Sequence, residues 1–259
     1  MNRRGFALLT ALWLTTALSV FAGAALSVAR LGTLTTRNRI VLARAGWARE
    51  ACVEILLARY ARDPTVRGVD TVDLGRETWC RAEVEDPGAR LNVNTVGRAA
   101  LVRILTSRRT EDALALVEGI RVIQRSGELV DLREVPRLEA FADHLTTRGT
   151  GAVNVNAAPE PVLRAVPGLG EEAVRVIRGR RASRRPIASV DELAALLSGS
   201  AKATLLADYH AFLGVASFAP TRLVARVEGG VRRTALLARA TLTLVPLPDR
   251  LAVIGRETE

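Results

Sequence analysis

The sequence predicts an α+β protein with one long amino-terminal helix, a small antiparallel sheet and a large inserted all-α domain. Three observations predict this class. An uncharged run leads directly into an amphipathic one, strand-like alternation occurs on both sides of the chain's middle, and an asparagine motif between those strands is repeated. With 259 residues, the chain can form one large domain or two small ones.

The amino-terminal segment has the length and polarity of a membrane anchor. No charged residue lies between Phe6 and Ala29, and a helix of about 24 residues is about 36 Å long, more than the roughly 30 Å of hydrocarbon in a bilayer. Arg3 and Arg4 precede this run, which predicts a single pass with a cytoplasmic amino terminus. The alternative is a secretory signal peptide cut near Ala22-Gly23-Ala24, which would leave a soluble exported protein.

Residues 30–62 are expected to continue the helix of residues 6–29 in amphipathic form. The expected apolar positions are Leu34, Val41, Ala45, Ala48, Cys52, Ile55 and Leu56. Of these, Leu34, Val41, Ala48 and Ile55 are expected to contact partner helices or this molecule's own sheet. Asp63-Pro64 predicts the helix end near Arg62, because proline disfavours helical backbone in the preceding residue.

Residues 63–95 are expected to begin the sheet. Thr78 to Val84 alternates in strand fashion, a turn is expected at Asp86-Pro87-Gly88-Ala89-Arg90, and Leu91 to Thr95 is expected to be extended.

Residues 206–259 are expected to complete the sheet. Leu223 to Glu228 and Val231 to Leu244 are expected to pair as a hairpin with its turn at Gly229-Gly230, because paired glycines permit positive φ. A short last strand is expected at 251–254.

Residues 96–205 are expected to form the inserted domain from two repeats. The motif Leu91-Asn92-Val93-Asn94-Thr95 recurs 62 positions later as Val153-Asn154-Val155-Asn156-Ala157. Each copy is expected to be an asparagine-containing turn followed by short helices.

The second copy contains a segment typical of a helix-hairpin-helix. Val166-Pro167-Gly168-Leu169-Gly170 precedes a helical pattern, and free amides at such a helix start can bind a phosphate oxygen. Candidate anion contacts are Gly168, Gly170, Arg178 and Arg180. They support an alternative function, because exported DNA-binding proteins of competence or type IV pilus systems have a similar motif order. The corresponding part of the first copy, Ile104 to Thr110, has no glycine, which favours a packing role.

The segment Arg3-Arg4-Gly5-Phe6-Ala7-Leu8-Leu9-Thr10 resembles the leader of type IV pilins and pseudopilins. The resemblance implies that prepilin peptidase removes residues 1–5 by cutting after Gly5 and then methylates Phe6. Most members carry glutamate at the fifth mature position, where this chain has Thr10. Absence of that glutamate is typical of the K component of type II secretion systems, and it makes Thr10 a candidate for packing of the membrane helix.

From about Arg3 to about Leu244 the chain resembles this minor pseudopilin. The resemblance implies a pilin-like helix and sheet, and a subunit that caps the pseudopilus tip, nucleates its assembly and supports export of folded proteins across the outer membrane. The implied partners are the I and J components, the major pseudopilin, prepilin peptidase and the inner-membrane assembly platform. The implied location is the inner membrane, with most of the chain in the periplasm, and nucleic acid is not expected as a partner.

No enzyme is expected, because His144 and His210 lie far apart in sequence and belong to no metal or hydrolase motif. The resemblance implies calcium as a ligand of K components. Glu85 and Asp86 are the candidate ligands here, although no EF-hand spacing occurs.

Composition leaves two further questions open. The formal charge of +10 comes almost entirely from arginine, which fits an anionic partner or a coding bias, while an aromatic content of 4% argues against stacked-base recognition. Cys52 and Cys80 are the two cysteines, and neither has the neighbours of a zinc site. In a periplasmic domain they can form a disulfide, and Cys52 also fits as a small apolar residue on a helix.

Overall fold

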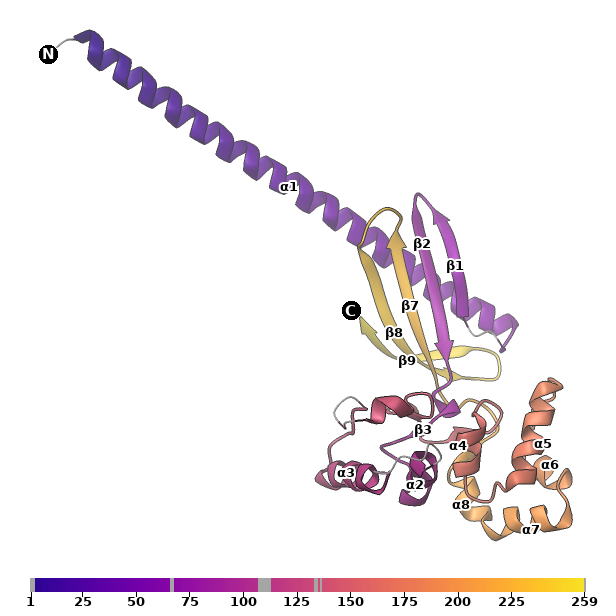
Figure 1. Ribbon diagram of the computed structural model, residues 1–259. Helices are drawn as coiled ribbons and strands as arrows, with labels where there is room; N and C mark the ends of the chain where they lie inside the picture. The colour runs from indigo at the N-terminus through magenta and orange to yellow at the C-terminus, as the bar shows by residue number, and fades with distance from the viewer. Residues whose placement is uncertain (1–2, 66–67, 107–112, 133–134, 136, 259) are drawn as a thin grey trace.

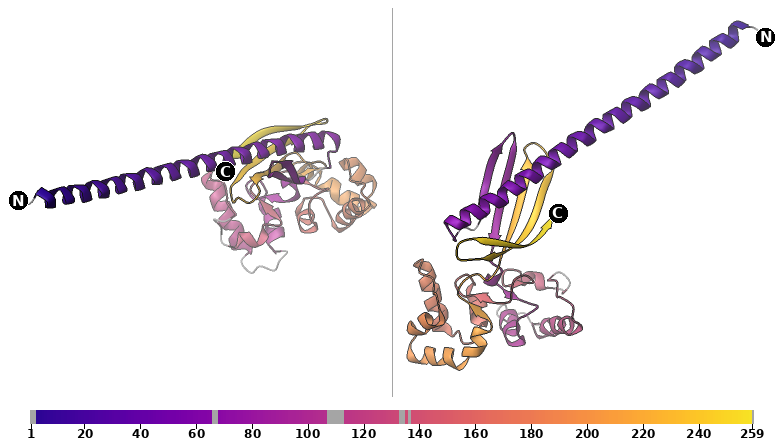
Figure 2. Two further views of the ribbon diagram at one scale, coloured as in Figure 1. Left: turned by 90° about the horizontal axis from the view of Figure 1, so that it is seen from above. Right: turned by 180° about the vertical axis from the view of Figure 1, so that it is seen from behind.

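In this computed structural model, the residues described are 3–65, 68–106, 113–132, 135 and 137–258. One long helix projects from the body with its first half and lies against a sheet with its second half (Figure 1). The inserted helices lie at the end of the sheet that is far from the amino terminus (Figures 1 and 2). The predicted combination of a long helix, an antiparallel sheet and inserted helices is confirmed.

Helix α1 spans Arg3–Arg62 and ends where the sequence predicts. Between Thr15 and Thr36, hydroxyl groups of this helix donate to backbone carbonyls about one turn earlier, which satisfies them without water. These residues are Thr15, Thr16, Ser19, Ser27, Thr33, Thr35 and Thr36. After the last turn, the Asp63 carboxylate accepts a hydrogen bond from Thr65 N at 2.8 Å and so supports the stop around Pro64.

Five strands form one antiparallel sheet in the order β1-β2-β7-β8-β9. Their bounds are β1 (Gly68–Gly75), β2 (Thr78–Glu85), β7 (Leu223–Val231), β8 (Leu237–Pro246) and β9 (Leu251–Thr258). Strand β1 was not expected from the sequence. Its register on β2 shifts between Val69 and Val72 and again between Asp73 and Gly75, and such bulges break the period of two by which a strand is recognised.

The expected turn at Gly229-Gly230 is wrong. Both glycines lie inside β7, opposite Cys80 and Trp79 of β2, and the chain turns only after Val231. A Cβ on Gly229 would lie 2.4 Å from Ala45 O and 2.3 Å from Arg49 N. Gly229 therefore allows the backbone of α1 to approach the strand closely, because it has no side chain. Its ability to adopt positive φ is not used here.

The inserted domain contains the remaining elements. They are η1 (Pro87–Ala89), β3 (Leu91–Asn92), α2 (Arg98–Thr106), α3 (Ala113–Ser126), η2 (Leu138–Phe141), β4 (Leu145–Thr146), β5 (Val153–Asn154), α4 (Glu160–Ala165), α5 (Glu171–Ala182), α6 (Val190–Ala195), α7 (Gly199–Ala207), α8 (Tyr209–Leu213) and β6 (Ala216–Ser217). The extended segment expected at 91–95 does not join the main sheet, since Leu91 pairs in parallel with Leu145. The inserted elements also continue beyond residue 205, and the main sheet resumes only at Leu223.

The asparagine motif makes the same hydrogen bonds in both copies. Asn94 accepts from Val130 N at 2.7 Å and donates to Val130 O at 3.4 Å. Asn156 accepts from Ile187 N at 3.0 Å and donates to Ile187 O at 2.7 Å. Each asparagine thus fixes a segment more than thirty positions further along the chain, and the sequence repeat corresponds to a repeated structural role.

Two separate cores hold the molecule together. One lies between the buried face of α1 and the sheet, and includes Cys52, Leu56, Cys80 and Leu242. The other fills the inserted domain. Because both are built mainly from aliphatic side chains, each part can bury a sizeable apolar area without stacked aromatic rings.

Candidate functional site

From residue 9 to residue 40, every residue of α1 is exposed in the structure. The helix is long and apolar enough to cross a membrane, and its most apolar stretch is not buried within the molecule. Trp13 and Phe21 have 72% and 75% of their surface exposed. Gly5 and Phe6 lie in the first turns of α1, and Thr10 is exposed on the same stretch. Of the expected leader, Met1 and Asn2 lie outside the described residues.

An apolar groove of about 470 Å³ runs beside α1 where the helix meets the sheet. Its lining residues are Ile40, Ala43, Arg44, Trp47, Ala48, Ala51, Leu74 and Thr78. Trp47 stands at its edge with 80% of its surface exposed. Ile40 and Arg44 also line a second groove of about 850 Å³, which extends along α1 towards the membrane half and contains Arg37 and Arg232. Together we call these two hollows the α1 groove.

Helical periodicity alone does not reveal Trp47 as a surface residue. The buried stripe of α1 passes through Ala45, Ala48 and Cys52, and Trp47 lies off that stripe among charged residues. A large aromatic side chain on the outward face of an amphipathic helix is the signal that marks it, because such a side chain exposes apolar area without an internal partner.

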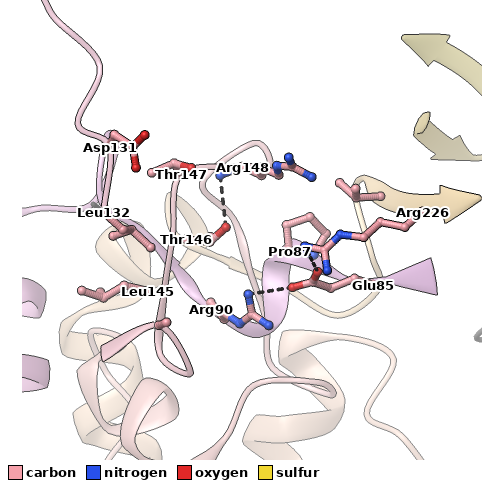
Figure 3. Close-up of a pocket in the computed structure, with 12 residues that line it drawn as sticks. Glu85, Pro87, Arg90, Asp131, Leu132, Leu145, Thr146, Thr147, Arg148 and Arg226 are labelled. Atoms are coloured by element: carbon pink, nitrogen blue, oxygen red, sulfur yellow. Dashed lines mark hydrogen bonds and ion pairs between the residues drawn. The ribbon is translucent and has the colours of Figure 1, made fainter. Parts of the chain in front are cut away.

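A charged pocket of about 540 Å³ lies where the sheet meets the inserted domain (Figure 3). Glu85, at the end of β2, pairs with Arg90 Nη1 at 2.7 Å and with Arg226 Nη2 at 3.8 Å. Figure 3 shows both guanidinium groups converging on this carboxylate from different segments. Glu85 is therefore occupied in joining β7 to the segment after β2.

Asp86, the other candidate calcium ligand, also has protein partners. One carboxylate oxygen accepts from Gly88 N at 2.8 Å and the other accepts from Asn154 Nδ2 at 2.7 Å. Among the described residues, no group of three or more His, Cys, Asp or Glu side chains is placed to hold a metal ion. The surroundings of Glu85 and Asp86 do not fit Ca²⁺, which requires six to eight converging oxygens.

The glycine hairpin of the second repeat is closed by the protein itself. Gly168 has φ of +75°, as a tight turn there requires, and its amide donates to Asp208 Oδ2 at 3.1 Å. Of the arginines nearby, Arg178 pairs with Glu160 and Arg180 pairs with Glu192. Gly170 is the N-cap of α5. Internal carboxylates thus occupy groups that a DNA phosphate would need, which does not favour the DNA-binding alternative. In the first repeat, residues 107–110 of the glycine-free segment expected from Ile104 to Thr110 lie outside the described residues.

The remaining candidate residues lie in two places. Cys52 and Cys80 are brought together in the core between α1 and β2, where both are fully buried. The histidines are not brought together in one site: His144 directly precedes β4, whereas His210 lies in α8 with its ring edge-on to Tyr209 at a centroid distance of 5.8 Å.

Both the sequence and the fold of this chain are similar to known proteins. Residues 153–212 match the family model of the type II secretion system protein K. The resemblance to the protein K family is confirmed. The matched segment extends from β5 through α8, the part that contains the second asparagine turn and the glycine hairpin. Members of this family are structural components of the type II secretion system.

The fold extends the likeness to protein K over nearly the whole chain. The structure matches a chain in the crystal structure of the GspK-GspI-GspJ complex from the enterotoxigenic Escherichia coli type 2 secretion system. The TM-score is 0.54 at 13% sequence identity, and the match covers 88% of this chain and 99% of that chain. The two chains therefore share a fold although few of their residues are identical.

Proposed function

We propose that this chain is a minor pseudopilin that caps the tip of a type II secretion pseudopilus and nucleates its assembly. The observation that carries the proposal is the position of the inserted domain, which lies at the end of the sheet far from the anchor (Figures 1 and 2). A subunit added above this one would meet that head. Subunits added below would still find the free first half of α1.

Thr10 supports the same position in the assembly. A buried carboxylate in the membrane is costly unless an amine or other partner compensates it. A subunit with no neighbour above it has no such partner to engage. A neutral, exposed threonine at this position of α1 fits a subunit that begins the assembly.

The α1 groove is the surface that we assign to the partner pseudopilins, which correspond to the I and J components. Ile40 follows Ala29 by eleven positions, which is roughly 16 Å along a helix and places the groove just outside the bilayer. A partner anchored in the same membrane would present its own helix there. The apolar lining with Arg37 and Arg44 at its edge fits a helix that has an apolar face and acidic flanks.

In the proposed pathway, the chain is first processed at the inner membrane. Prepilin peptidase would cut between Gly5 and Phe6 and methylate the new amino terminus, and most of the chain would lie in the periplasm. The assembled tip, growing on the inner-membrane platform with the major pseudopilin below it, would support export of folded proteins. Its action is mechanical, and no catalytic step is assigned to it.

The test of processing is intact-mass analysis of the membrane-extracted protein, produced with and without prepilin peptidase. The expected product begins at methylated Phe6 and appears only with the peptidase, and Gly5→Leu should leave the precursor uncut. A start near Ala25 in both strains would instead identify an ordinary exported protein and restore the DNA-binding alternative.

The test of capping uses Lys202, the one lysine of the chain, which is exposed on α7. The purified chain is labelled with amine-reactive gold at Lys202 before it is mixed with the partner pseudopilins, and the label should then mark one end of each pseudopilus that forms. Label distributed along the length would show that the subunit is not a cap. Lys202→Arg is the matched control, because it keeps the charge and removes the reactive amine.

A further inference from the structure

The two cysteines of the chain meet inside the core between α1 and the sheet. Cys52 and Cys80 are both fully buried, and both are free thiols in this structure. Both belong to the same buried cluster, and the Cys80 thiol is near enough to Cys52 to add to the rise in its pKa. Two residues separated by 27 others, one on a helix and one on a strand, therefore face each other across a packed interface.

Cys80 lies beside the place where α1 approaches the backbone of the sheet. Cys80 lies directly opposite Gly229 in the pairing of β2 with β7. Because Gly229 has no side chain, the backbone of α1 at Ala45 and Arg49 rests against the strand. A disulfide requires Cα atoms about 4.4–6.8 Å apart, and a helix and a strand reach such a separation only where the residues between them are small.

We propose that Cys52 and Cys80 form a disulfide that fastens α1 to β2. This inference rests on the proposed function in one respect, since it needs the domain beyond the anchor to lie in an oxidising compartment. The bond would join α1 covalently to β2. A force that acts along α1 would then not separate the helix from the sheet.

The chemistry balances with a disulfide-bearing oxidant. The thiolate of one cysteine attacks the oxidant's S–S bond, forming a mixed disulfide and releasing one thiolate of the oxidant. The second cysteine thiolate then attacks the protein sulfur of that mixed disulfide and releases the other. Two protein thiols are oxidised, the oxidant is reduced to two thiols, and two protons leave the cysteines.

The surroundings of the pair indicate when the bond would form. Burial raises the pKa of the Cys52 thiol, an effect to which the neighbouring Cys80 adds, and burial also raises the pKa of Cys80. Since the thiolate is the reactive species, oxidation is expected while the chain folds and before the core closes. Once formed, the bond would be protected from reductants by the same burial.

The test begins with the full-length chain refolded in detergent with a mixture of oxidised and reduced glutathione. The refolded protein is then denatured without reductant and treated with a maleimide. No cysteine should react, the intact mass should be lower by two hydrogen atoms, and reductant should restore both reactive thiols. Two reactive thiols in protein that has regained its native circular dichroism would overturn the proposal and leave the proposed function untouched.

The same measurement on protein trapped with acid and maleimide directly from cells separates the two ideas. Bonded cysteines there support the proposal. A bond that forms in the refolded protein but is absent in cells would overturn the inferred bond together with the periplasmic placement. Wild-type protein that is unfolded and refolded in reductant should have a lower Tm than the oxidised protein, whereas the Tm of Cys52→Ala/Cys80→Ala should be the same after both treatments. The thiol count on the wild-type chain does not depend on whether this variant folds.

Discussion

Two residues at the interface between α1 and the sheet show how much depends on single side chains. Gly229 on β7 leaves the space that the backbone of α1 occupies. Glu50 on the exposed side of α1 is bound by Arg256 from β9 and by its neighbour Arg49. At Gly229 the missing side chain lets α1 rest on β7, and at Glu50 an ion pair joins α1 to β9.

Adding a side chain at Gly229 is expected to separate helix and sheet. In Gly229→Val, the new Cβ would overlap backbone atoms of α1 at 2.3 and 2.4 Å, and overpacking of this kind costs about 1–3 kcal/mol or more. Urea unfolding should show the loss. Gly179→Ala is the control, because a Cβ there meets nothing within 4 Å and should stabilise helix α5 by about 0.5–1 kcal/mol. Equal stability of Gly229→Val and wild type would show that α1 does not rest on this strand.

The Glu50 pair predicts a pH dependence of stability. The hydrogen bond from Arg256 lowers the pKa of Glu50 from its ordinary value of 4.5. A lowered folded-state pKa stabilises the fold at pH values above 4.5, and this contribution is lost as the pH falls through the lowered pKa. Because Glu50 is half exposed, its contribution is at most about 1 kcal/mol.

The measurement for Glu50 is the Tm of wild type and Glu50→Gln between neutral and acidic pH. The variant should be less stable near neutrality, and the difference should vanish in acid. Glu54→Gln, one turn further along α1, is the matched control. A difference between Glu50→Gln and wild type that is independent of pH would contradict the assignment.

At the scale of elements, short polar turns hold the inserted domain in shape where regular structure is scarce. The parallel pairs β3–β4 and β5–β6 are each two residues long. Around them, Asn94 and Asn156 hydrogen-bond backbone groups of distant segments. Because buried polar groups must be satisfied, these asparagines decide which segments lie side by side.

Removing the second asparagine is expected to loosen the segment before α6. Asn156→Ala would lose the hydrogen bonds to Ile187 N, Ile187 O and Phe218 O, and unsatisfied buried groups cost about 1–3 kcal/mol each at most sites. Amide hydrogen exchange should rise at Ile187 and around it. Asn38→Ala, on the exposed part of α1, is the control and should change neither exchange nor unfolding. Unchanged protection at Ile187 would contradict this role.

At the scale of the whole molecule, the chain separates a candidate membrane anchor, a helix half that packs on the sheet, and an inserted domain. The exposed apolar half of α1, the half of α1 that lies against the sheet and the inserted domain follow one another along the molecule (Figure 1). The two separate cores allow the head and the sheet to be stable parts of one subunit. A change in the groove can therefore affect assembly without affecting either core.

Truncation of Trp47 tests this separation. In Trp47→Ala, affinity for the partner minor pseudopilins should fall at least about tenfold, since buried aromatic anchors at interfaces are worth about 2 kcal/mol or more. The Tm should not change, because 80% of the side chain is exposed. Leu129→Ala is the matched control, as Leu129 is 79% exposed but lies in the inserted domain. Equal losses in both variants, or none in Trp47→Ala, would remove the groove from the assembly surface.

The sequence was informative where a pattern is long or repeated. The extent of α1, the strands on both sides of the insertion and the asparagine repeat could all be predicted, because each rests on a periodicity or on identical residues. The position of Gly229-Gly230 could not, since a glycine pair signals a turn and a close approach equally well. Strand β1 was hidden by its bulges. The pairing of Glu85 with Arg226 depends on a tertiary contact that no local pattern records.

The recess at Gly229 also has a consequence for orientation. A smooth helix lying on a flat sheet could roll about its axis or slide by a few ångströms, whereas a helix whose backbone sits in a notch at Ala45 and Arg49 can do neither. Helix α1 is continuous from Arg3 to Arg62. The contact at Gly229 therefore fixes the rotation of the first half of α1 about its axis relative to the inserted domain. A neighbouring subunit that packs against the first half of α1 would thereby also fix the orientation of the inserted domain.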